Sequence, residues 1–164
     1  MVCKSDDETG MSAWRAFLGA HATATDRIET MLADAELPSL AWFDVLATIH
    51  RSDEKQLRHF ELATEMVMSR SGLSRMVDRI EAAGLIERRS CPNDRRGQHL
   101  ALTQDGETML GKMWPIYQAG VTTHFTAHIG EDAGVVGEAL GRVEGACRGR
   151  TADCGESPST ELSV

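Results

Sequence analysis

The spacing of apolar residues along the chain predicts a mainly helical protein. A first helix is expected from Ser12, a suitable N-cap, because apolar residues recur every three or four positions beyond it. A second helix opens at Pro38 and is apolar almost all round, which indicates a buried central position. A polar loop at residues 51–56 then separates it from a short third helix at residues 59–66.

The fourth helix combines a core face with a polar face. It is expected from Ser69 to Ala83 and ends at Gly84, a residue that suits the left-handed conformation closing many helices. Its apolar residues fall at positions i, i+3, i+4 and i+7: Leu73, Met76, Val77 and Ile80. Two short strands follow at residues 85–90 and 98–102, and the turn-forming residues between them predict a β-hairpin.

The last part of the chain is predicted to be helical again. Thr103 can cap a long fifth helix, in which Pro115 is expected to produce a kink. Gly130 is expected to end this helix, and a sixth helix begins at Asp132. The whole pattern therefore describes a mainly α fold of six helices with one small β-hairpin.

Composition is that of a soluble protein with one domain. The chain has 164 residues, of which 41% are hydrophobic and 26% charged. We assign residues 12–150 to a single domain and expect flexible ends at residues 1–11 and 151–164. No apolar run approaches the roughly 20 residues that span a bilayer, and the N-terminus lacks the apolar core of a signal peptide. The expected location is therefore the cytoplasm, where the four cysteines are free thiols.

Positive charge is concentrated in one segment of an acidic chain. The formal net charge is −8, yet residues 69–99 hold seven arginines against four acidic residues. That segment carries +3, which leaves −11 for the rest of the chain. Such asymmetry points to contact with a polyanion through one basic face, because phosphate neutralisation needs only local positive charge. Ordinary surface variation is the alternative explanation for the charge alone.

The third and fourth helices, with the tight break between them, predict a helix-turn-helix. In such motifs the N-terminal half of the second helix reaches base edges in the major groove. The residues that we assign to base or phosphate contacts are Ser69, Arg70, Ser71, Ser74 and Arg75. The hairpin reaches on the order of 15 Å further, so its tip can lie along a minor groove, where arginine is favoured. Its assigned contacts are Arg88, Arg89, Arg95 and Arg96, with Asp94 holding Arg96 in place.

The segment from Ser69 to Gly106 resembles the DNA-binding half of the MarR family of bacterial transcriptional regulators. The matching pieces, in order, are Asp78-Arg79-Ile80-Glu81, Gly84-Leu85-Ile86, Asp94-Arg95-Arg96 and Leu102-Thr103-Gln104-Asp105-Gly106. Upstream, the run LAWFDVL at residues 40–46 matches the family's second helix. The resemblance extends over about 70 residues, and the outer helices match only in position and apolar character.

The resemblance implies a homodimer with winged helix-turn-helix lobes. In this chain the lobe is expected at residues 37–102 and the dimerisation helices at residues 12–33 and 103–149. The resemblance also implies that Arg96 enters the minor groove and that Asp94 orients it. A pseudo-palindromic duplex operator is the implied partner, and the implied function is that of a sequence-specific regulator, in the first place a repressor.

Many members of the family bind a small phenolic or aromatic acid between the dimer body and the DNA-binding lobe. The candidate ligand residues come from elements that line this cleft in relatives: Trp14, His21, Trp42, Arg51 and Tyr117. An arginine with aromatic neighbours suits a carboxylated ring. The alternative is that the tryptophans fill the core.

Other chemistries were weighed against this interpretation. His124 and His128, four residues apart on a helix, can hold zinc, but pairs without further ligands are usually structural. No metal or other cofactor is therefore expected, and zinc control stays an alternative. Cys91 lies among arginines that activate a thiol towards oxidation, so redox sensing is a further alternative to a plain loop cysteine.

The remaining classes of function account for the sequence less well. An interaction module without DNA binding would leave the basic hairpin without a purpose. The sequence contains no G-x-S-x-G, P-loop, H-E-x-x-H or dinucleotide-binding motif, so the protein is not expected to be an enzyme.

Overall fold

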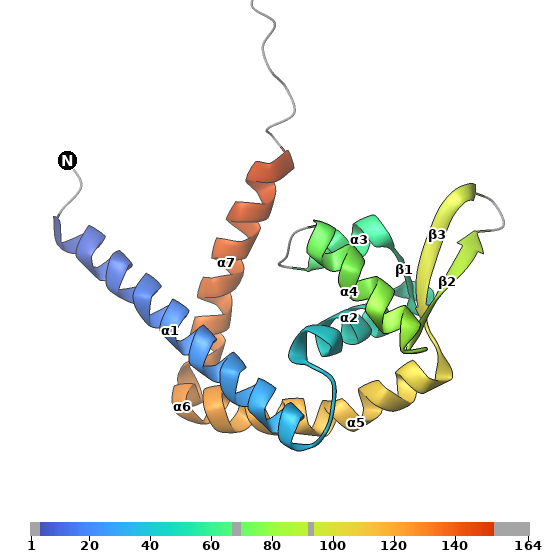
Figure 1. Ribbon diagram of the computed structural model, residues 1–164. Coiled ribbons are helices and arrows are strands. Elements are labelled where there is room, and N and C mark those ends of the chain that lie inside the picture. The colour runs from blue at the N-terminus through green and yellow to red at the C-terminus, as the bar shows by residue number, and fades with distance from the viewer. Residues whose placement is uncertain (1–3, 67–69, 92–93, 153–164) are drawn as a thin grey trace, which may run out of the picture. The chain divides into compact units, whose positions relative to one another are not determined.

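The computed structural model describes the backbone of residues 4–66, 70–91 and 94–152, and the side chains of residues 8–66, 71–89 and 98–148 (Figure 1). The chain divides into two units, residues 1–125 and 126–164. The helices and strands of the first unit are α1 (Lys4–Asp34), α2 (Leu40–Arg51), the 3-10 turn η1 (Asp53–Lys55), β1 (Gln56–Arg58), α3 (His59–Glu65), α4 (Arg70–Ala82), β2 (Ile86–Cys91), β3 (Asp94–Leu102) and α5 (Gln104–Val121). A π-helical segment, η2 (Thr122–Thr126), crosses the boundary, and the second unit contains α6 (Ala127–Ile129), η3 (Gly130–Asp132) and α7 (Ala133–Ala152).

The predicted central helix is confirmed, because α2 supplies the middle of the core. Its residues Phe43, Val45, Leu46, Ala47 and Ile49 are buried. Helices α1, α3, α4 and α5 and strands β1 and β3 all pack against it. At its start, the Leu40 amide donates to the Glu29 carboxylate of α1 over 2.7 Å. A side chain of α1 therefore satisfies one of the four amides that a helix N-terminus leaves without a partner.

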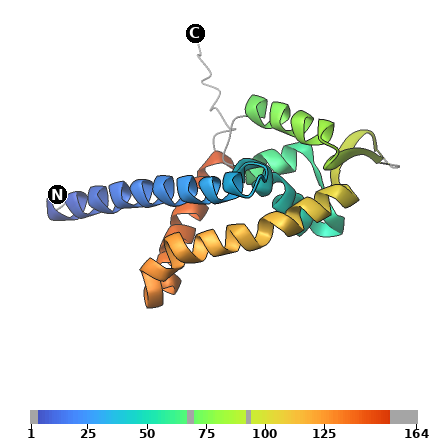
Figure 2. The same ribbon diagram turned by 60° about the horizontal axis from the view of Figure 1, so that its bottom comes forward.

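The predicted start of the first helix is wrong. Instead of beginning at Ser12, α1 begins at Lys4 and includes the acidic run at residues 6–8. Negative charge in the first turns of a helix is stabilising, because it faces the positive end of the helix dipole. Towards its other end, α1 lies beside α5 (Figure 2). Gly120 of α5 permits this approach, since an added Cβ would come within 2.8 Å of Ile28.

The predicted loop at residues 51–56 is also wrong in part. It contains the turn η1 and leads into β1, so the sheet has three antiparallel strands in the order β1-β3-β2. Strand β1 was missed because its three residues are too few to establish a periodic pattern. Leu57 of β1 pairs with Leu100 of β3, and the strand thereby closes the inner edge of the hairpin against the core.

The junction between the hairpin and α5 follows the prediction. The Thr103 hydroxyl accepts a hydrogen bond from the Gly106 amide over 3.0 Å and donates to the Gly84 carbonyl over 2.6 Å. Gly84 has a φ of 75°, the left-handed conformation expected of it. Helix α5 continues through Pro115, and the irregular turn falls later, at η2. Helix α7 then runs from Ala133, one residue after the expected start.

Candidate nucleic-acid interface

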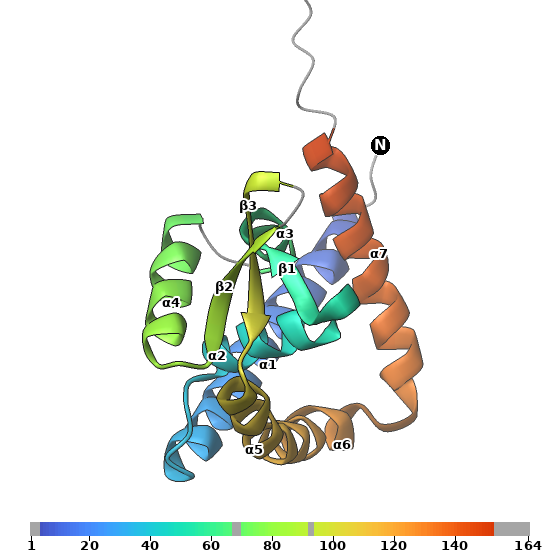
Figure 3. The same cartoon turned by 90° about the vertical axis from the view of Figure 1, so that its right-hand side faces the viewer.

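The predicted helix-turn-helix is formed by α3 and α4. The core stripe of α4 is confirmed for Leu73, Val77 and Ile80, which are fully buried against α2 and the sheet, whereas Met76 is only partly buried. From α3, Leu62 enters the same core. With one face of α4 fixed in this way, the opposite face points away from the core. Figure 3 shows α4 lying beside β2 at the side of the sheet.

The outer face of α4 carries part of the predicted contact set. Ser71 and Arg75 are exposed. Ser74 is partly buried, and its Oγ lies 3.3 Å from Nε2 of His59, so this hydroxyl links the two helices of the motif. Ser69 and the Arg70 side chain lie outside the described residues.

The predicted wing is the β2–β3 hairpin, which extends beyond the helices of the lobe (Figure 1). Its strands pair from Ile86 with Leu102 as far as Ser90 with Gln98, and the register shifts between Ser90 and Cys91. The backbone of residues 94–96 belongs to β3. The side chains of Asp94, Arg95 and Arg96, and with them the expected Asp94–Arg96 pair, lie outside the described residues.

Two of the predicted DNA contacts are engaged within the lobe. Nη2 of Arg88 lies 2.6 Å from Oδ1 of Asp78, and its Nη1 donates to the Glu81 carboxylate. Nη2 and Nε of Arg89 lie 2.6 and 2.7 Å from the same oxygen of Glu87, Oε1. Carboxylates already neutralise both guanidinium groups, so their charge contributes little to the attraction of a phosphate.

Helix α4 has two arginines with described side chains, Arg75 and Arg79, and their surroundings differ. The guanidinium of Arg79 lies over the Trp42 ring, 5.9 Å from the centroid. A flat cation is attracted to an aromatic face, and here the contact ties α4 to α2. Arg75 forms no ion pair with any residue whose side chain the structure describes. It is therefore the described arginine of α4 that is both exposed and uncompensated.

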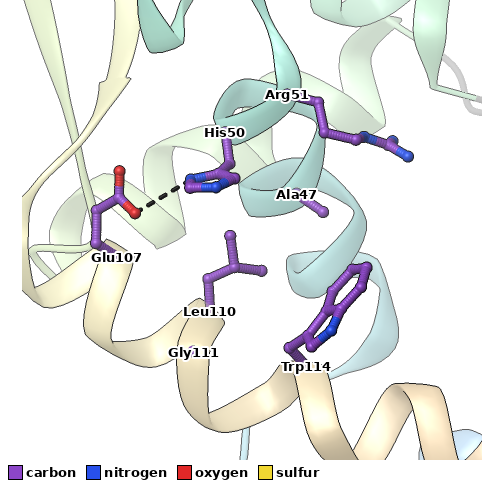
Figure 4. A pocket seen from close by; sticks show the side chains of 7 residues that line it. All are labelled: Ala47, His50, Arg51, Glu107, Leu110, Gly111 and Trp114. Carbon is purple, nitrogen blue, oxygen red and sulfur yellow. Dashed lines mark ion pairs between the residues drawn. The ribbon is translucent and has the colours of Figure 1, made fainter.

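A second site lies between α2 and α5, where a cavity of about 400 Å³ opens (Figure 4). It is lined by Ala47, His50, Arg51, Glu107, Leu110, Gly111 and Trp114. At one end, Nδ1 of His50 lies 3.1 Å from Oε2 of Glu107, while Nζ of Lys55 lies 3.2 Å from Oε1. The His50 contact has the distance of an ion pair without hydrogen-bond geometry, so among the described residues this buried nitrogen has no hydrogen bond. Arg51 and Trp114 lie at the other end.

The structure brings one of the predicted ligand residues, Arg51, to this cavity. Tyr117 stacks on Phe43 with ring centroids 4.2 Å apart, and burial raises its pKa above the ordinary value, with a smaller contribution from Asp44. Trp42 lies under Arg79. Trp14 and His21 are exposed on α1, each beside Phe17, and do not line the cavity.

The sequence interpretation missed His50, Glu107 and Trp114 as cavity residues. One signal was present, since Trp114 and Gly111 are three residues apart on one face of the fifth helix. A large aromatic ring one helical turn from a glycine can leave a cavity on that face of the helix, because the glycine has no side chain to fill it.

The sequence left zinc binding and thiol oxidation open as alternative functions, and the described residues test each of them only in part. Within the described residues, no group of three or more His, Cys, Asp or Glu side chains is arranged to hold a metal ion. His124 lies in η2 and His128 in α6. Cys91 ends β2 with its side chain outside the described residues, and Cys147 of α7 is an exposed free thiol. None of the described helices is long and apolar enough to cross a membrane.

A helix-turn-helix followed by a β-hairpin on a three-stranded sheet defines the winged helix-turn-helix class. The profile of the MarR family matches residues 38–97, the α2-to-wing part of this lobe. AbsC, a MarR family transcriptional regulator from Streptomyces coelicolor, superposes with a TM-score of 0.78 at 31% identity, over 86% of this chain and 95% of that one. The chain belongs to the MarR family.

Two further relatives are similar in sequence or structure. Sco3205, another MarR family transcriptional regulator from Streptomyces coelicolor, was solved in complex with DNA. It has a TM-score of 0.69 at 28% identity, over 91% of this chain and 88% of that one. The transcriptional repressor MprA of Escherichia coli (strain K12) is 36% identical over 73 residues. The matched part is 44% of this chain and 42% of MprA, so the likeness in sequence spans less than half of that relative. All three relatives are transcription regulators rather than enzymes.

Proposed function

We propose that the protein is a sequence-specific DNA-binding regulator of transcription that acts as a repressor. The observation that carries this proposal is the exposed, uncompensated Arg75 on the outer face of α4, next to a projecting hairpin. Helix α4 would lie in a major groove, while the hairpin follows the neighbouring minor groove. The likeness to MprA, a repressor, and to Sco3205, which was solved with DNA, supports the proposal.

The proposed contacts fall into two sets. In the major groove and on its phosphates they are Ser69, Arg70, Ser71, Ser74 and Arg75. At the tip of the wing they are Arg95 and Arg96, with Asp94 orienting Arg96. Because Arg88 and Arg89 are paired with carboxylates inside the lobe, they contribute less direct attraction than the sequence indicates.

Replacement of Arg75 tests this function. A duplex is first selected by the wild-type protein from random or genomic fragments. Arg75→Ala should then cost about 1–3 kcal/mol of binding free energy if the residue reads a base, or lower the salt slope by about one unit if it contacts a phosphate. Arg27→Ala on α1 removes the same charge away from α4 and should bind normally. Unchanged affinity and salt slope for Arg75→Ala would contradict the proposed role of α4.

We further propose that the protein acts as a homodimer on a pseudo-palindromic operator. The support is an apolar stripe on α1, where Met11, Trp14, Phe17 and Leu18 are all exposed. Clustered exposed apolar side chains are typical of an interaction surface. A second copy of the chain is the proposed occupant, because two identical lobes would read two half-sites about one helical turn apart.

We also propose that a small aromatic or phenolic acid binds in the cavity between α2 and α5 and alters DNA binding. Leu110 and Trp114 supply apolar walls for a ring, and Arg51 supplies a cation for a carboxylate. A cavity of about 400 Å³ has room for such a molecule. The ligand acts on DNA only if it binds the free and DNA-bound conformations with different affinity.

The effector proposal can be tested with salicylate and related benzoates. In a variant that carries Trp14→Phe and Trp42→Phe, Trp114 is the remaining tryptophan, so its fluorescence reports on the cavity. Salicylate should quench this fluorescence and release the selected duplex, and Arg51→Gln should weaken both effects together. If DNA is released without any change at Trp114, the ligand binds elsewhere.

A further inference from the structure

Arg88 lies at the contact between helix α4 and the wing. Its Nη2 is 2.6 Å from Oδ1 of Asp78, and its Nη1 donates to Oε2 of Glu81. Asp78 and Glu81 are three residues apart, so both project from the same face of α4. The side chain of Arg88 is 29% exposed, less than the 56% of its neighbour Arg89.

The strand register explains why Arg88 faces α4. Arg88 pairs with Leu100 and Ile86 pairs with Leu102, and these three apolar partners are buried. Because alternate residues of a strand share a face, Arg88 continues the core-facing row of β2 towards the hairpin tip. Glu87 and Arg89 lie on the other face, where they pair with each other.

The local charge argues against Arg88 as a phosphate contact. One guanidinium shares two carboxylates, so the three side chains together carry a net charge of −1. Both terminal nitrogens are directed at these carboxylates, so an approaching phosphate would be repelled by their negative charge as well as attracted by the guanidinium. A planar fork held at two points is suited to fixing geometry, since both of its bonds constrain direction as well as distance.

We propose that Arg88 is a positioning residue that holds the wing in a fixed orientation relative to α4. The brace, meaning Arg88 with Asp78 and Glu81, joins the two elements that would enter adjacent grooves. It sets their spacing before DNA is bound, which reduces the ordering cost of binding. This inference rests on the proposed DNA-binding function, and it changes the role of Arg88 from a contact to a support.

The direction in which DNA affinity changes after a charge-neutralising substitution distinguishes a phosphate contact from a positioning role. The double variant Asp78→Asn, Glu81→Gln removes two negative charges near DNA and frees Arg88. If Arg88 contacted phosphate, affinity for the selected duplex would rise. If the brace positions the wing, affinity should fall roughly 3- to 10-fold despite the added net positive charge. Glu87→Gln is the matched control. It removes an acid from β2, the strand that carries Arg88, but Glu87 lies outside the brace, so this variant should bind at least as tightly as wild type.

The salt dependence of binding gives a second readout. Arg88→Gln should lower affinity at every salt concentration while leaving the slope of log affinity against log salt unchanged. A slope reduced by about one unit would instead indicate a lost phosphate contact and overturn the proposal.

Hydrogen exchange of the free protein tests the brace without DNA. In the double variant, the amides of β2 and β3 should exchange faster than in wild type, whereas those of α2 should not change. Equal exchange in the hairpin would overturn the brace. If wild type selects no duplex from the fragments while hairpin exchange rises as expected, the brace stands and the proposed function fails, so the two failures are distinguishable.

Discussion

The charge of Asp44 depends on its surroundings on α2. Burial raises the pKa of its carboxyl above the ordinary value of 3.8, the positive charge of Arg51 lowers it, and Glu29 raises it by a smaller amount. The same carboxylate contributes to the raised pKa of Tyr117. Much of the Asp44 surface stays in contact with solvent, so its burial is partial and the resulting cost to folding is small.

Asp44→Asn should therefore stabilise the protein in a pH-dependent way. A carboxyl with a raised native pKa makes folding less favourable as pH rises from 3.8 through the native value, since the folded state disfavours the charged form. At neutral pH the variant should melt slightly above wild type, and the difference should shrink as the pH falls towards the ordinary carboxyl pKa of 3.8 and vanish below it. Thermal melts across this range provide the measurement, and a gain that persists in acid would refute the explanation.

The arginines show why a charge count along the sequence overstates the basic character of the lobe. Residues 69–99 carry a net charge of +3. In the folded lobe, Arg88 and Arg89 are paired with acids and Arg79 lies on an aromatic ring. The sequence shows which residues of this segment are charged, and their role in DNA contact stays a prediction. The Arg89–Glu87 pair is local to β2, but the partners of Arg88 and Arg79 could not be assigned, because those contacts join α4 to a strand or to another helix and no local spacing encodes them.

At the scale of elements, one junction explains the Leu-Thr-x-x-Gly segment at residues 102–106. The Thr103 amide donates to the Leu85 carbonyl over 3.1 Å, and the Thr103 hydroxyl binds both Gly84 and Gly106. The end of α4, the root of the wing and the start of α5 therefore meet at a single point. Gly106 lies so close to Leu85 that an added Cβ would fall on its carbonyl oxygen.

Gly106→Ala should disrupt this junction. The added methyl group would clash with the Leu85 carbonyl, which is held by a hydrogen bond from Thr103. The clash can be removed only if α5 moves, so we expect a loss of about 2–4 kcal/mol of unfolding free energy. Gly111→Ala in the same helix meets nothing within 4 Å and should stabilise by about 0.5–1 kcal/mol, the usual gain of alanine over glycine. Urea titrations of both variants would contradict the argument if the two changes had the same sign.

Periodicity predicted the long elements of the fold well and the short ones poorly. The stripe of α4 and the apolar surroundings of α2 follow directly from residue spacing. Strand β1 depends on pairing with β3, a contact distant in sequence, and the preceding turn has positive φ at Glu54 and Lys55. Neither residue favours that conformation, so no local signal announces the turn. Similarly, the cavity residues Glu107 and Trp114 become meaningful only once α5 lies beside α2.

At the scale of the whole molecule, the exposed stripe of α1 bears on how many lobes act together. Trp14 is 51% exposed and lies beside Phe17, with ring centroids 5.8 Å apart. Exposed tryptophans of this kind often dominate the energy of protein interfaces. A single winged lobe offers few base contacts, so a second lobe at a fixed spacing would increase both affinity and selectivity.

Replacement of this stripe should convert a dimer into monomers. We expect Trp14→Ser with Leu18→Ser to weaken self-association at least about 30-fold, which corresponds to the 2 kcal/mol typical of an interface hot spot. Both side chains are exposed in the chain described here, so the fold of the lobe itself should survive. Sedimentation equilibrium measures the dissociation constant. Circular dichroism checks the secondary structure.

Phe60→Ser provides the matched control for this experiment. Phe60 is 63% exposed on α3, away from α1, and its removal should leave the dissociation constant unchanged. Monomeric double variants should lose affinity for a duplex with two half-sites far more than for one with a single half-site, because only the former benefits from two linked lobes. If wild-type protein sediments as a monomer at micromolar concentration, α1 is not a dimer surface. The DNA contacts proposed for α4 do not depend on this result, because the Arg75→Ala experiment tests them separately.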